Sequence, residues 1–176
     1  MNFDNVVFPD SVGFRCKNCG DCCRLQPPDV SRTEQKRIEA KGFTDFLESA
    51  DKNGIRWVQR QKEGSCFFLT KNNRCSIFDV RPQACRLEPF TIVDYDYEKN
   101  RIEVDLNFPF SCCCIGTCDE KTVPTEEIGR AAQILVQKIL ALTANDLGLP
   151  PTDKRVYAET RSRFLRRRAE MADLKL

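Results

Sequence analysis

Cysteine is the residue type through which this sequence could do chemistry. The chain has 176 residues, with 11 cysteines and no histidine. Thiolates bind iron and zinc, so a dense set of cysteines indicates a metal centre or redox chemistry. The densest stretch has the spacing Cys-x2-Cys-x2-Cys-Cys, and the other cysteines follow it. The positions are Cys16, Cys19, Cys22, Cys23, Cys66, Cys75, Cys85, Cys112, Cys113, Cys114 and Cys118.

A secreted scaffold held by disulfides is the alternative explanation for so many cysteines. The N-terminal stretch has neither the basic start nor the apolar segment of a secretory signal, so we expect a cytoplasmic protein. Structural disulfides are rare in that reducing compartment. The odd number of cysteines and the run Cys112–Cys113–Cys114 also argue against a disulfide framework. We therefore interpret the cysteines as metal ligands or redox groups.

The cysteine spacing favours iron–sulfur clusters, with zinc as the alternative. The pattern Cys16-x2-Cys19-x2-Cys22 can place three sulfurs around one iron–sulfur cube. The adjacent Cys22 and Cys23 project in different directions, so one of them could serve a second centre. Four-cysteine zinc sites usually combine two separate Cys-x2-Cys pairs, and no second pair follows here. Two [4Fe–4S] clusters take about eight thiolates. The predicted ligands are Cys16, Cys19, Cys22, Cys23, Cys66, Cys75, Cys85 and one of Cys112, Cys113 and Cys114.

Short helices and strands must bring these distant cysteines together. A capping box at Ser31-Arg32-Thr33-Glu34 predicts a helix that runs to about Lys41. Further along, apolar periodicity and turn residues predict several more elements. They are a short helix over Thr44–Ala50, a strand over Ile55–Gln61, a hairpin over Cys66–Leu69 and Cys75–Phe78, a short helix that begins at Arg81-Pro82, and a hairpin over Phe90–Tyr97 and Arg101–Leu106.

The last third of the chain has no cysteine and a helical pattern. We predict helices over Thr125–Ala144 and from Thr152 to about Leu174, paired as an antiparallel hairpin. The predicted fold class is α+β: a small cysteine-rich metal-binding domain with short β-hairpins and helices, followed by the helical hairpin. The expected domains are residues 1–120, which bind the clusters, and residues 121–176, which form the hairpin.

The sequence contains no recognisable catalytic constellation. Without histidine, the usual general base and the Ser/His and Cys/His nucleophile pairs are excluded, so we predict no catalytic residues. The net charge of +2 gives no reason to expect DNA binding, and no apolar stretch is long enough to insert into a membrane. No small-molecule substrate is evident. We expect a redox- or oxygen-responsive accessory protein, or an electron-transfer protein, that docks on a larger protein partner.

Two arginines flank the cysteine of the predicted short helix. Arg81 and Arg86 could neutralise the negative charge of a thiolate-bound cluster or hydrogen-bond its sulfurs. We therefore predict both as cofactor-binding residues. Ordinary surface arginines are the alternative interpretation.

Three blocks of the sequence resemble one known family. They are Phe14-x-Cys16-x2-Cys19-Gly20-x-Cys22-Cys23-Arg24, then Cys66-x-Phe68-Leu69, then Cys75-x-Ile77-Phe78-x2-Arg81-Pro82-x2-Cys85-Arg86. In this order they resemble the CxxCxxCC family of YkgJ-type cysteine cluster proteins.

That resemblance implies chelation of zinc or iron, and some members are described as iron–sulfur oxidoreductases. A flagellin lysine N-methylase has a similar cysteine cluster, so a lysine methylase-like enzyme is a further alternative, as is a structural zinc-binding interaction module. Relatives often carry one cysteine after the second hairpin, and this match implies Cys112 as the eighth ligand.

Overall fold

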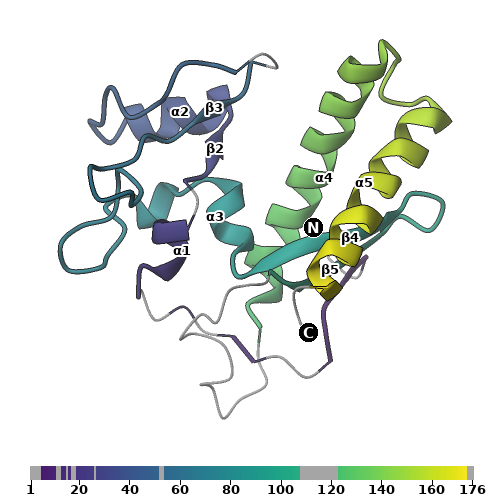
Figure 1. Cartoon of the computed structure of the whole chain (residues 1–176), viewed down its shortest axis with the longest axis horizontal. Coiled ribbons are helices and arrows are strands. Elements are labelled where there is room, and N and C mark those ends of the chain that lie inside the picture. The colour runs from purple at the N-terminus through teal and green to yellow at the C-terminus, as the bar shows by residue number, and fades with distance from the viewer. Residues whose placement is uncertain are drawn as a thin grey trace.

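Helices and small sheets make up an α+β fold, as predicted (Figure 1). The computed structural model of the chain describes residues 5–10, 13–14, 16, 19–25, 27–51, 54–107 and 123–173. In chain order the elements are β1 (Val6–Val7), α1 (Asp21–Leu25), β2 (Asp29–Val30), α2 (Arg32–Glu39), β3 (Arg56–Trp57), η1 (Phe78–Val80), α3 (Gln83–Leu87), β4 (Phe90–Asp96), β5 (Arg101–Leu106), α4 (Thr125–Leu147) and α5 (Lys154–Asp173).

The predicted hairpin of β4 and β5 is confirmed, and it forms most of a three-stranded sheet. The two strands pair antiparallel, with Ile92 opposite Val104 and a bulge between Ile92 and Asp94. β1 adds to the outer edge of β5 in parallel. β4 is buried along almost its whole length because α4 and α5 pack over it. We call β1, β4, β5, α4 and α5 the sheet–helix lobe.

The two predicted C-terminal helices are confirmed as α4 and α5, and they lie side by side in Figure 1. Gly148 ends α4 in a left-handed conformation, with φ of 64°, which glycine adopts at little cost. The helices share one apolar core with the sheet, so this core crosses the expected domain boundary near residue 120. Its buried members include Phe90, Ile92, Ile102, Val104, Ile128, Ala132, Val136, Val156 and Phe164.

The described residues between Cys16 and Leu87 form a second unit with shorter elements, which we call the cysteine lobe. The predicted capping box is confirmed: the Glu34 backbone N–H donates to Ser31 Oγ, and the Ser31 N–H donates to Glu34 Oε2 at 2.8 Å. Glu34 Oε1 also accepts from the Gln83 N–H at 2.7 Å, which joins α2 to the start of α3. The core of this lobe contains Val30, Ile38, Phe46, Val58, Phe68 and Ile77.

The predicted helix over Thr44–Ala50 is wrong. This segment is extended: Phe46 accepts a hydrogen bond from the Gln59 N–H at 2.9 Å, and Leu47 pairs with Val58. Asp45 has a φ of 53°, which a right-handed helix cannot contain. Phe46 reaches the core at 2% exposure through this extended path. Tertiary pairing therefore overrides the local helical preference.

The predicted strands around the cysteines are shorter than expected. β3 covers only part of the predicted strand, and its neighbours continue as isolated bridges. The hairpin near Cys75 is reduced to one bridge between Leu69 and Cys75. α3 begins at Gln83, with Pro82 as its N-cap.

Charged contacts join the two lobes where α3 packs against α4. Glu127 on α4 accepts from Arg81 at 3.0 Å and from Arg86 at 2.7 Å. Lys138, near the middle of α4, forms an ion pair with Asp29 of β2. On α5, the arginine side chains at 161, 163, 166 and 168 all contact carboxylates of the same chain. None of the helices among the described residues combines the length and apolar character that crossing a bilayer requires.

Candidate metal centre

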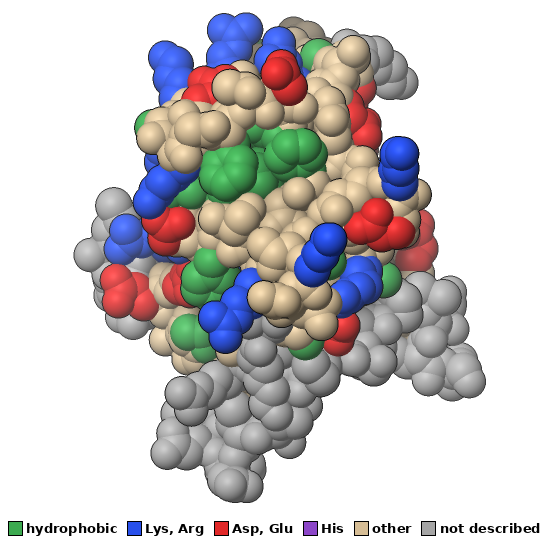
Figure 2. Space-filling view, turned by 90° about the vertical axis from the view of Figure 1, so that its left-hand side faces the viewer, with side chains coloured by type: hydrophobic (Ala, Val, Ile, Leu, Met, Phe, Trp, Pro, Cys, Tyr) green, Lys and Arg blue, Asp and Glu red, His purple; other side chains and the backbone are tan. Residues whose placement is uncertain are grey.

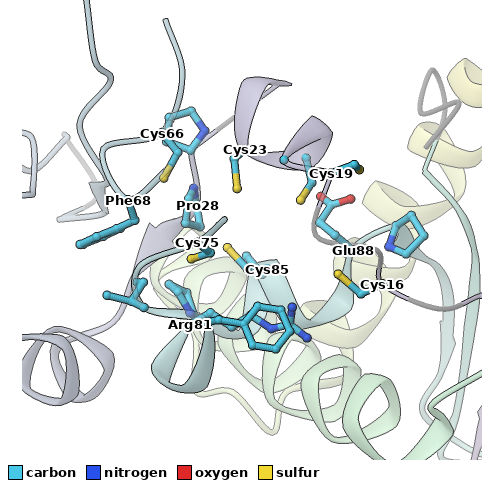
Figure 3. A pocket seen from close by; sticks show the side chains of 18 of the residues that line it. Cys16, Cys19, Cys23, Pro28, Cys66, Phe68, Cys75, Arg81, Cys85 and Glu88 are labelled. Atoms are coloured by element: carbon cyan, nitrogen blue, oxygen red, sulfur yellow. The ribbon is translucent and has the colours of Figure 1, made fainter. Parts of the chain in front are cut away.

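One cavity of about 250 Å³ is lined by seven of the eight predicted metal ligands (Figure 3). None of these seven cysteines forms a disulfide. They come from four separate parts of the chain: the stretch before and within α1, the strand-like segments around residues 66 and 75, and α3. They are Cys16, Cys19, Cys22, Cys23, Cys66, Cys75 and Cys85. The eighth predicted ligand, Cys112, lies outside the described residues, together with Cys113, Cys114 and Cys118.

Gly20 allows the first cysteine stretch to wrap closely against the rest of the lobe. Its φ is 78°, and a Cβ at this position would meet Leu69 Cδ1 at 2.9 Å and the Asn73 carbonyl oxygen at 3.3 Å. The one-turn helix α1 then begins, with the Cys23 N–H donating to the Gly20 carbonyl at 3.0 Å. Arg24 donates to the Cys19 carbonyl at 3.1 Å. Backbone contacts therefore position this stretch.

Hydrogen bonds of the backbone position the next two cysteines. The Cys66 N–H donates to the Cys23 carbonyl at 2.8 Å, so residue 66 is tied directly to α1. The Gln61 side chain donates to the carbonyls of Cys66 and Leu69 at 2.9 Å and 2.7 Å. The backbone of Cys75 is positioned by its β-bridge with Leu69. Figure 3 shows the side chains of Cys23, Cys66, Cys75 and Cys85 directed into one part of the cavity.

The pKa values of four thiols of this cavity are raised above the ordinary value for cysteine. Burial raises the pKa of Cys66 to about 11 and raises the pKa of Cys75 in the same direction. The pKa of Cys85 rises well above its ordinary value because of burial and then because of the neighbouring thiols. A hydrogen bond with Cys23, followed by burial, raises the pKa of Cys22. Metal ligation needs thiolates, so metal binding here must release protons.

The thiols of this cavity outnumber the four ligands that a single tetrahedral metal ion takes. No group of three or more Cys, Asp or Glu side chains in the described part of the chain stands ready to hold one ion. Sulfurs around tetrahedral zinc lie about 3.8 Å apart, as Zn–S bonds of about 2.3 Å imply. The seven thiols instead surround a cavity of about 250 Å³. This donor set of thiols, in a chain with no histidine, fits zinc or iron.

The two predicted cofactor-binding arginines occupy different positions. Arg81 lines the cavity, with its guanidinium 4.2 Å from the ring centroid of Phe78. Its Nε is buried and has no hydrogen-bond partner among the described residues, so one donor is available on the cavity wall. Arg86 belongs to α3 but is not one of the residues that line this cavity. It donates to the Asp79 carbonyl at 2.8 Å and to Glu127.

The lining of the cavity also contains three charged residues that the sequence analysis missed: Asp29, Glu88 and Arg167. Glu88 ends α3 as its C-cap residue, and Arg167 reaches the cavity from α5. Burial raises the pKa of Glu88 to about 7, against a hydrogen bond from Asn107 and the charge of Arg167. The spacing of Glu88 three residues after Cys85 was a usable signal, because such residues share a helix face. No local pattern could indicate Arg167.

Large apolar side chains are exposed on the cysteine lobe near the cavity. Leu25, Phe67 and Phe78 are each exposed by more than a third, at 45%, 38% and 42%. Figure 2 views the molecule from the side of this lobe and shows hydrophobic side chains gathered near the centre of the face, with charged side chains around them.

Comparisons with known proteins agree with this cysteine pattern. The family model CxxCxxCC, described as "Putative zinc- or iron-chelating domain", matches residues 15–113. An uncharacterized protein of Methanocaldococcus jannaschii, MJ0661, is 30% identical over 98 residues, which are 52% of this chain and 52% of that protein. The chain thus spans about half the length of this curated relative. No solved structure matches the chain.

Proposed function

Because this chain belongs to the CxxCxxCC family, we propose that it is an iron–sulfur protein with two [4Fe–4S] clusters in the cysteine cavity. The observation that carries the proposal is the convergence of seven cysteines on one cavity. A structural zinc ion needs about four thiols, and seven exceed that number. Two cubes need about eight, which is about one more than the seven of this cavity. Cys112 is the proposed eighth ligand on the family resemblance.

The width of the cavity supports clusters over a mononuclear ion. A cube holds its cysteine ligands farther apart than a single zinc ion does, because the iron and sulfide atoms lie between them. Among the described residues, no group of three or more potential metal ligands is arranged to hold a single ion. Zinc bound by four of these cysteines is the alternative that the experiment below separates.

Each part of the chain has a distinct role toward the clusters. A bound cluster supplies one-electron redox chemistry. The cysteine thiolates bind its iron, and Phe68 and Ile77 on the wall exclude water. Arg81 places positive charge near Cys75 and has an unused Nε–H donor, so it would offset the negative charge of the thiolates.

We propose a redox role for the protein: electron transfer, or response to oxygen or redox state, as an accessory to a larger protein partner in the cytoplasm. The exposed side chains of Leu25, Phe67 and Phe78 support docking on a partner, because large apolar groups beside a redox centre commonly become buried at an interface. Loss of a cluster would loosen the lobe that carries them and so alter this surface.

The direct test is metal analysis of protein purified without oxygen. We expect about eight irons per chain with matching sulfide, and a broad visible absorption. Cys19→Ser should lower the iron content, because Cys19 lines the cavity. Cys118→Ser, at a position outside the family pattern, should lower it less.

Zinc without iron in a colourless sample would overturn the iron–sulfur proposal and leave a zinc-binding interaction module. Equal iron content in the wild type and in Cys19→Ser would overturn the ligand assignment while leaving the cluster type standing.

A further inference from the structure

Glu88 is one of two carboxylate residues that line the cavity together with the thiols. The other, Asp29, already forms an ion pair with Lys138. Glu88 lies three residues beyond Cys85, at the end of α3. Figure 3 shows its carboxylate at the end of the cavity where Cys16 and Cys19 lie, away from Cys66. All four residues line the same cavity. The structure therefore places an oxygen donor beside two of the cysteine ligands.

Without a bound metal, the position of this carboxylate lowers the stability of the fold. Glu88 Oε2 is buried and has no hydrogen-bond partner among the described residues. A buried carboxylate oxygen without a partner opposes folding, and such groups persist when a ligand or a metal satisfies them. Arg167 contributes only its charge, whereas the side chain of Asn107 hydrogen-bonds the carboxyl group. One oxygen is thus held in place and the other remains available.

The contact with Asn107 is the kind of support that ligating carboxylates have. A carboxylate that binds a metal is usually oriented by a hydrogen bond from a neighbouring side chain. Asn107 follows β5 directly, and its own N–H donates to the Pro89 carbonyl at 2.8 Å, so the sheet fixes its position. The carboxylate is therefore oriented by the sheet–helix lobe, while its backbone belongs to the end of α3.

We infer that Glu88 binds iron through Oε2 and completes the ligand set at the Cys16 and Cys19 end of the cavity. The inference rests on the proposed function and changes one part of it, the identity of the eighth ligand. Seven described cysteines and one carboxylate supply the roughly eight ligands of two cubes without Cys112. The iron held by Glu88 has an oxygen ligand, which binds iron–sulfur clusters less firmly than a thiolate.

The test compares four variants with the wild type, all purified without oxygen. Glu88→Gln keeps the shape of the side chain but removes the anionic ligand. Glu88→Cys replaces the oxygen ligand with a thiolate. Glu126→Gln is the matched control, because this glutamate is 77% exposed on α4 and pairs with Arg130. Cys112→Ser tests the ligand that the family resemblance indicates. The measurements are iron and sulfide content, the Mössbauer spectrum, and the circular dichroism that reports folding.

We expect a distinct signal from one iron of about eight in the wild type, because that iron has an oxygen ligand. Glu88→Gln should lower the content to between about four and seven irons. Glu88→Cys should retain the iron and lose the distinct signal, a rescue that a merely structural role would not produce. Glu126→Gln should match the wild type in iron content and in the distinct signal. Cys112→Ser should keep the distinct signal, because Glu88 supplies the oxygen ligand that causes it.

Three results would overturn the inference. Glu88→Gln with wild-type iron content and spectrum would remove Glu88 from the ligand set while leaving the iron–sulfur proposal intact. Loss of iron in Cys112→Ser but not in Glu88→Gln would return the eighth position to Cys112. A wild-type chain with zinc and no iron would overturn this inference and the proposed function together. If Glu88→Gln fails to fold, the spectrum of Glu88→Cys still decides, because an unchanged distinct signal there excludes ligation by Glu88.

Discussion

The cysteine lobe and the sheet–helix lobe achieve order by different means. In the sheet–helix lobe, helices of 23 and 20 residues pack on a continuous sheet and share a large apolar core. In the cysteine lobe the helices have 5, 8 and 5 residues, and β2 and β3 have 2 residues each. Such short elements are marginal without tertiary support.

The difference indicates which lobe depends on metal. The cysteine lobe has a smaller apolar core, and seven of its side chains are thiols around a cavity. Metal bonds to these thiols would close the loops between α1, residues 66–75 and α3, in the way that structural metals stabilise small domains. We expect the sheet–helix lobe to depend less on such bonds, because its core extends from β1 to α5.

Removal of the metal should produce the largest difference between the lobes. Amide hydrogen exchange should accelerate by about 100-fold or more in the cysteine lobe, because loss of metal bonds opens it locally. The informative amides are those of Cys66 and Ser76, which donate to the carbonyls of Cys23 and Phe68. Peptides from β4 and β5 should exchange at nearly the same rate with and without metal. Equal acceleration in both lobes would show that they unfold as one unit.

A pair of core substitutions sharpens the same comparison. Phe90→Ala should cost about 3–5 kcal/mol with or without metal, because Phe90 is 1% exposed in the sheet–helix core and contacts the rings of Phe8 and Phe14. Phe68→Ala removes a ring of equal size that is 2% exposed in the other core. Phe68→Ala should lower the free energy of unfolding of the metal-loaded protein strongly. Without metal the loss should be much smaller, because this core is then already loosened.

Urea unfolding followed by two spectroscopic signals can separate the unfolding of the cysteine lobe from that of the sheet–helix lobe. Trp57 lies in the cysteine lobe and is the one tryptophan of the chain, so its fluorescence reports that lobe. Circular dichroism is dominated by the long helices of the sheet–helix lobe. A cost of Phe68→Ala that is the same with and without metal would contradict the dependence of this lobe on metal.

The smallest expected effect concerns the charged contact between the lobes. Burial raises the pKa of Glu127, but hydrogen bonds from Arg81 and Arg86 outweigh it and hold the pKa below its ordinary value of 4.5. Glu127→Gln should cost about 1 kcal/mol at neutral pH, since the carboxylate is 37% exposed and solvent screens it.

The pH dependence of this contact follows from the lowered pKa. The stabilising contribution is fully present above pH 4.5 and is lost as the pH falls through the lower pKa of the folded state. The stability difference between the wild type and Glu127→Gln should therefore disappear in acid. Glu126→Gln, at the neighbouring and more exposed position, should show little effect at any pH. A difference that persists in acid would mean that the substitution acts through packing.

Local patterns in the sequence were sufficient to predict the position of several helices and strands. The capping box of α2, the hairpin of β4 and β5, and the helices α4 and α5 form where the sequence predicts them. Each depends on residues that are close in the chain, so its signal is local. The segment around Phe46 shows the limit: it has a helical pattern, yet it pairs in extended form with residues near Gln59.

The sequence by itself determined the kind of chemistry: thiols in a ligand spacing, no histidine, and three blocks in the order of one family. Only the tertiary structure decided that Cys22, Cys66 and Cys85 meet in one cavity. It also decided that Glu88 shares this cavity and that Arg167 reaches it from α5. The reason is physical: residue type and spacing set what a side chain can bind, whereas its neighbours depend on packing between segments distant in the chain.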